Sequence, residues 1–203
     1  KCAYDPFSNE EKCWEKKYIS GKVSLHALEQ LEIIKAEDNI PEFKWFIGLK
    51  GIETSETKIL DRIPEKLKKN IKYLEISSEE ELDIKKLDFP NLEVLRLLFT
   101  DVKNFNILSE FKKLEVLILN NITVTGENSA ELSALKELSI IKGEGLGDFN
   151  FFEKSYNLKR LDIGRSTFEN ADVLKNLNEL EELSLWNNNI KNIEVTADKK
   201  KLK

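Results

Sequence analysis

The sequence predicts an α/β solenoid, in which stacked coils place one parallel sheet along a concave side and short helical or 3₁₀ returns along the convex side. The first observation is an internal repeat of about 22 residues. The second is a change of spacing within one copy, since successive leucines from Leu174 to Leu185 lie three, three, three and two residues apart. Spacings of three suit a 3₁₀ return, whereas a spacing of two suits a strand. Each coil is therefore expected to contain one return and one strand.

Each copy of the repeat has apolar residues at a start position and at three and five residues after it. Only Thr54 among these template positions is polar. The starts lie 21, 22, 21, 22, 21, 23 and 22 residues apart, at Leu28, Leu49, Ile71, Leu92, Leu114, Leu135, Leu158 and Leu180. The positions at +3 and +5 point the same way from a strand, and stacked coils bury these side chains in one core. We expect strands centred near Leu31, Ile52, Leu74, Leu95, Leu117, Leu138, Leu161 and Leu183.

The residues around each strand support this division. Apolar residues three and six positions before several starts, such as Leu108 and Phe111, predict that the returns also face the core. Eight positions after a start, several coils have a short polar residue, and we expect its side chain to bond the backbone where the strand ends. These polar residues are Thr57, Thr100, Ser166 and Asn188.

The segment LKNLNELEELSLWNNNIKNIEV resembles the 22-residue class of leucine-rich repeats, of the internalin-like bacterial type. Intracellular phosphatase-regulatory proteins have similar repeats. The resemblance covers residues 25–195, which we predict to form eight leucine-rich repeats. It implies a horseshoe-shaped module that binds a protein on its concave face and is not an enzyme.

The two ends differ from the repeats. Residues 1–24 are predicted to form an N-terminal cap, because Ser8 and Glu11 have capping-box spacing and Gly21 can end a short helix. Cys2 and Cys13 are compatible with one disulfide in an oxidising compartment, and two reduced thiols are the alternative. The final segment TADKKKLK, residues 196–203, is predicted to be a polar C-terminal tail.

Composition and residue types exclude several function classes. A formal net charge of -5 argues against nucleic-acid binding, and no stretch approaches the roughly 18 to 20 apolar residues of a membrane helix. His26 is the only histidine, and with two cysteines it gives too few ligands for a zinc site. The sequence GEGLGD at 143–148 lacks the lysine of a phosphate loop. We expect no catalytic residue, cofactor or metal.

The residues between the template positions face away from the core, and three neighbouring coils have apolar ones there. A contiguous exposed apolar patch usually marks an interaction site, although β-branched residues are also simply favoured in strands. Trp186 is either a second contact or a cover for the last coil. Glu32, Glu53 and Glu75 form an acidic row that suits a basic partner or only keeps the sheet soluble. The predicted partner-binding residues are Val94, Arg96, Leu98, Val116, Ile118, Asn120, Ile141 and Trp186.

Two functional hypotheses follow. The first is a secreted or cell-surface bacterial protein that binds another protein; it rests on the resemblance, on the two cysteines, and on a sequence that begins at Lys1 without methionine. The alternative is a cytoplasmic regulatory or inhibitory subunit that docks on an enzyme.

Overall fold

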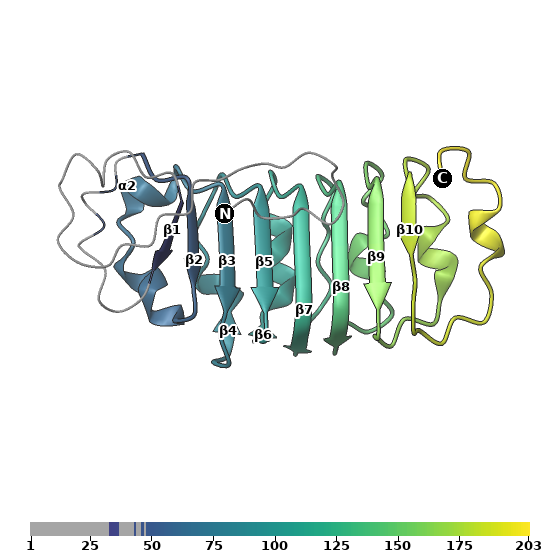
Figure 1. Cartoon of the computed structure of the whole chain (residues 1–203), viewed down its shortest axis with the longest axis horizontal. Helices are drawn as coiled ribbons and strands as arrows, with labels where there is room; N and C mark the ends of the chain where they lie inside the picture. Colours follow the sequence, from purple (N-terminus) through teal and green to yellow (C-terminus); the bar gives the residue numbers. More distant parts are fainter. Residues whose placement is uncertain (1–32, 37–42, 44–45, 47) are drawn as a thin grey trace.

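The computed structural model describes residues 33–36, 43, 46 and 48–203, which form one open sheet of ten parallel strands. Figure 1 shows the strands side by side along the longest axis of the molecule, with helical segments behind them. Along the sheet the main strands are β1 (Ile33–Ala36), β2 (Gly51–Thr54), β3 (Tyr73–Ser77), β5 (Val94–Leu98), β7 (Val116–Thr125), β8 (Glu137–Glu144), β9 (Arg160–Gly164) and β10 (Glu182–Ser184). Two short strands, β4 (Leu82–Asp83) and β6 (Asp101–Lys103), extend the sheet beyond the first turn. The predicted leucine-rich-repeat solenoid with a single parallel sheet is confirmed.

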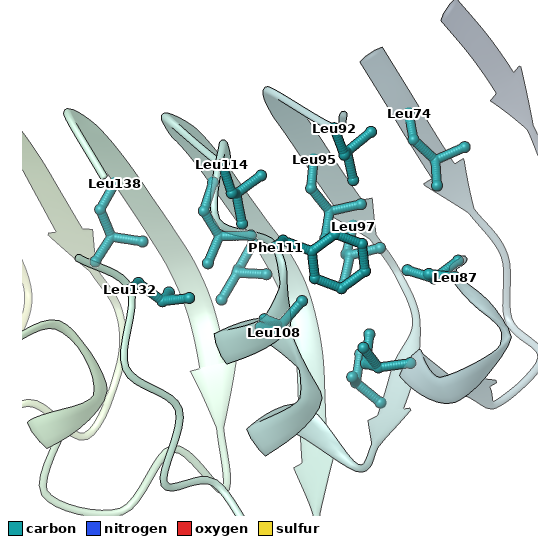
Figure 2. Close-up of a cluster of buried hydrophobic side chains, with 14 of the residues drawn as sticks. Leu74, Leu87, Leu92, Leu95, Leu97, Leu108, Phe111, Leu114, Leu132 and Leu138 are labelled. Carbon is teal, nitrogen blue, oxygen red and sulfur yellow. The ribbon is translucent and has the colours of Figure 1, made fainter. Parts of the chain in front are cut away.

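The strand register follows the repeat. The central template residues align across the sheet from β2 to β10, as Ile52, Leu74, Leu95, Leu117, Leu138, Leu161 and Leu183. All but Leu183 of the last strand are fully buried. Figure 2 shows template leucines such as Leu95 packed together with Leu108 and Phe111 of a return. One core therefore runs through the stacked coils.

The returns are short and mostly 3₁₀, as expected. They comprise helix α2 (Glu65–Lys68) and 3₁₀ segments at Thr57–Arg62, Ile84–Lys86, Phe105–Glu110, Asn150–Phe152, Ala171–Leu174 and Glu194–Thr196. Phenylalanines pack between the coils: the Phe105 and Phe151 rings meet edge to face with centroids 5.2 Å apart, and Phe149 and Phe168 do so at 5.1 Å. Such pairs stabilise a core beyond the area that they bury.

The first coil differs from the prediction by three residues. Ile34 follows the template residue Ile33, so alternation predicts that it points outward, yet it is buried and pairs in register with Ile52. Leu31, the expected strand centre, lies outside the described residues. Ile33 and Ile34 are consecutive apolar residues, so alternation alone does not decide which of them faces the core. Gly51 accommodates the observed register, because a Cβ there would lie 2.9 Å from the Ile33 side chain.

Residues 196–203, predicted as a polar tail, pack onto the last coil. The Lys203 N–H donates to the Glu181 carbonyl at 3.0 Å, which repeats the bond from Glu181 to Lys159 one coil earlier. Leu202 packs against the core, and Lys199 is buried, which lowers the pKa of its ammonium group. This segment thus has the contacts of a further return. The predicted cap at 1–24, with Cys2 and Cys13, lies outside the described residues.

We expect Leu117→Ala to lower the free energy of unfolding by about 2 to 5 kcal/mol, because it leaves a cavity between fully buried neighbours. Ile118→Ala is the matched control, since Ile118 is half-buried on the opposite side of the same strand, and its cost should be clearly smaller. Urea denaturation of both variants measures the difference. Equal losses would contradict the assigned orientation of β7.

Candidate partner-binding face

The outward face of the sheet brings the predicted apolar residues together on three adjacent strands, β5, β7 and β8. We call Val94, Leu98, Val116, Ile118 and Ile141 the apolar patch. Val94 and Val116 are direct neighbours, and Leu98 and Ile141 lie on either side of Asn120. All five side chains are half-buried by their neighbours. The face is therefore a shallow apolar surface and not a pocket.

Charged residues on both sides of the apolar patch are already paired within the sheet. On the β3 side, Glu75 accepts a hydrogen bond from the Tyr73 hydroxyl at 2.8 Å and forms an ion pair with Arg96 at 3.0 Å. Burial, with the nearby Glu75 charge, raises the pKa of Tyr73 well above its usual range, so its hydroxyl remains a donor. On the β9 side, Arg160 pairs with Glu137. These borders present little uncompensated charge.

The acidic row predicted at Glu32, Glu53 and Glu75 is wrong as a row of exposed glutamates. Lys35 occupies the register position beside Glu53, and Glu32 lies outside the described residues. Glu53 is buried, and Glu75 is paired with Arg96. The shifted register of the first coil explains the error.

Trp186 lies across the neighbouring strand. A Cβ at Gly164 of β9 would fall 2.2 Å from the indole ring, so the ring covers the place where a side chain would stand. Its Nε1 donates to Asp162 at 3.2 Å, and the Arg165 guanidinium lies 5.3 Å from the ring centroid. The indole is 39% exposed. Because Gly164 aligns with Ile141, Trp186 extends the outward face from the apolar patch toward the last coil.

The residues seven positions after each repeat start, inside β7 and β8 and shortly after β5, β9 and β10, form a second row that the repeat pattern does not predict. Five consecutive coils place a non-glycine residue in the left-handed region there, with φ between 51° and 56°: Phe99, Asn121, Lys142, Arg165 and Asn187. We call these residues the strand-end row. Phe99 has 55% of its surface exposed. The alternation of a strand does not predict a left-handed residue at this position. The only signal in the sequence is that each of these residues lies seven positions after a repeat start.

The polar residues one position further on bond the strand-end backbone in three of the four coils. The Thr100 hydroxyl lies 2.8 Å from the Ser78 carbonyl, the Gly143 N–H donates to the Ser166 hydroxyl at 3.0 Å, and the Asn188 amide donates to the Ile163 carbonyl at 2.7 Å. Thr57 instead donates to the Glu80 carboxylate at 2.7 Å. These side chains stabilise the turns and are not available for a ligand.

The part of the chain that the structure describes contains no cluster of three or more residues able to hold a metal ion. Within the same residues, no helix is long and apolar enough to cross a membrane.

Comparison with solved structures shows an internalin-like leucine-rich-repeat fold. Internalin C2 of Listeria monocytogenes matches with a TM-score of 0.67 and 20% identity over 89% of this chain and 82% of its own. Internalin F of the same species matches with a TM-score of 0.62 and 17% identity over 88% of this chain and 54% of its own. Neither protein-family models nor curated protein sequences give a match. At these identities the likeness is one of fold.

We expect Gly164→Ala to displace the Trp186 indole and break its bond to Asp162, because the new methyl group would overlap the ring. The indole N–H signal of Trp186, assigned with Trp186→Phe, should move in a ¹H–¹⁵N spectrum. Stability should fall by less than about 1 kcal/mol, since the exposed ring can move away. In a Trp186→Ala background, Gly164→Ala should leave the stability unchanged. An unmoved indole signal in Gly164→Ala alone would contradict the described contact.

Proposed function

We propose that this leucine-rich-repeat chain is a non-enzymatic module that binds a protein partner on the concave face of its sheet, with the apolar patch at the centre of the contact. The observation that carries the proposal is the composition of that face. Five apolar side chains lie on the adjacent strands β5, β7 and β8, and Glu75, Arg96, Glu137 and Arg160 beside them are paired. Apolar cores within polar rims are the usual anatomy of protein interfaces.

The rigidity of the sheet supports this proposal. The outward side chains stand on a parallel ladder whose other side is fully buried, so their positions are set before a partner arrives. Pre-organisation lowers the entropic cost of association. A modest patch can then contribute to specific binding when its central residues are desolvated.

We further propose that the protein is secreted or displayed on a bacterial surface. The fold likeness to Listeria internalins and the disulfide predicted between Cys2 and Cys13 support this location. A cytoplasmic regulatory subunit is the second candidate, and it requires that Cys2 and Cys13 stay reduced. Thiol counting on protein isolated from its natural source separates them, because a complete bridge favours export and two reactive thiols favour the cytosol.

Ile118→Arg should weaken binding of a protein partner more than tenfold, because it places a charge at the centre of the apolar patch. Its own fold should be nearly unchanged, since Ile118 points away from the core. Ser184→Arg is the matched control: Ser184 is exposed and lies in the same outward row, three strands away. A partner isolated with the parent protein is titrated against both variants by calorimetry.

Equal affinity for the parent and for Ile118→Arg, with both melting at the same temperature, would contradict the proposed site. A loss shared equally by Ser184→Arg would place the contact on the whole face and not on the apolar patch.

A further inference from the structure

Phe99 is an unusual residue for the backbone that it occupies. It has a φ of 56°, where bulky side chains are outliers and asparagine is tolerated. Asn121 and Asn187 occupy the equivalent turns, so the fold accepts the less strained residue there. More than half of the Phe99 surface is exposed, which means that core packing does not compensate the strain. Strain at an exposed aromatic residue points to an interaction.

The strand-end row also carries unpaired positive charge. Lys142 and Arg165 stand on neighbouring coils, and neither makes an ion pair with a described residue, whereas Lys72 and Lys136 pair with Glu93 and Glu115 one coil away. Adjacent like charges repel, and ion pairing among the described residues does not offset this repulsion. The Trp186 ring holds the Arg165 guanidinium in place.

A depression of about 400 Å³ lies between this row and a second, acidic one. Asp101 of β6, Thr123 of β7 and Glu144 of β8 align across the sheet two residues after the strand-end row. Within the described part of the chain, neither Asp101 nor Glu144 has an ion-pair partner. Phe99, Lys142 and Arg165 line the other side. Most of its lining residues belong to β6 and to the carboxyl-terminal halves of β7 and β8, toward which the arrows point in Figure 1.

We propose that this depression binds an extended segment of a protein partner, in which an apolar side chain contacts Phe99 and a carboxylate further along contacts Lys142 and Arg165. Coils are spaced by about 4.8 Å and an extended chain rises about 3.3 Å per residue, so the two side chains lie about three to four residues apart. A basic side chain on the opposite edge of the segment faces Asp101 and Glu144. This proposal rests on the proposed function in one respect only, namely that the partner is a protein.

The test is selection of phage-displayed random linear peptides on the parent protein, followed by titration of synthetic copies. Selected peptides should combine an apolar residue with a carboxylate about three to four residues away. Phe99→Asn and Lys142→Glu should each weaken their binding roughly tenfold, and replacing the peptide carboxylate by lysine should restore binding to Lys142→Glu.

Two controls separate this role from an effect on stability and from the general loss of an exposed aromatic ring. Tyr156→Asn removes an aromatic ring of the same exposure, 55%, from a return segment and should leave binding unchanged. Phe99→Asn should melt at the parent temperature or above, because asparagine tolerates the left-handed turn.

The proposal is overturned if no peptide class is enriched, if the enriched peptides lack the carboxylate, or if Phe99→Asn binds them as the parent does. Peptides that lose affinity for Ile118→Arg but keep it for Phe99→Asn overturn this proposal and leave the concave-face function standing.

Discussion

No single coil of this chain can bury its own leucines, and the rest of the structure depends on that constraint. Leu183 of the edge strand β10 is half-buried, whereas Leu161 of β9, which has a strand on each side, is buried. Stacking in turn imposes one register on the parallel ladder from β2 to β10. Because side chains alternate across a strand, burial of one set determines which residues face outward.

This division separates stability from recognition. The inward positions accept little change, whereas the outward positions contribute little to the core and vary from apolar on β5 and β7 to charged on β9. Where outward charges occur near the apolar patch, they pair with one another, as Glu75 does with Arg96. The sheet thus offers an apolar surface in a fixed position, with the charges of Glu75, Arg96, Glu137 and Arg160 beside it paired.

Stacking also determines the backbone of the strand-end row, and there it imposes conformational strain. This left-handed backbone is held by bonds between coils, such as the Phe99 N–H to the Asn120 carbonyl at 2.9 Å and the Arg165 N–H to the Trp186 carbonyl at 3.1 Å. Those bonds involve only the backbone, so they impose the turn on phenylalanine and arginine as well as on asparagine. The left-handed backbone at Phe99 is therefore a consequence of stacking. The presence of phenylalanine there is not, since asparagine occupies the equivalent position at Asn121.

The solenoid, the inward leucines and the apolar patch can be predicted from the sequence, because a period of about 22 residues and the alternation within each strand encode them directly. Tertiary structure decided the rest. The adjacent apolar residues Ile33 and Ile34 allow two registers, and contacts with β2 select one. The position of Trp186 depends on the missing side chain of Gly164, one coil away. Such contacts join residues about 22 positions apart, where local sequence patterns carry no information about packing.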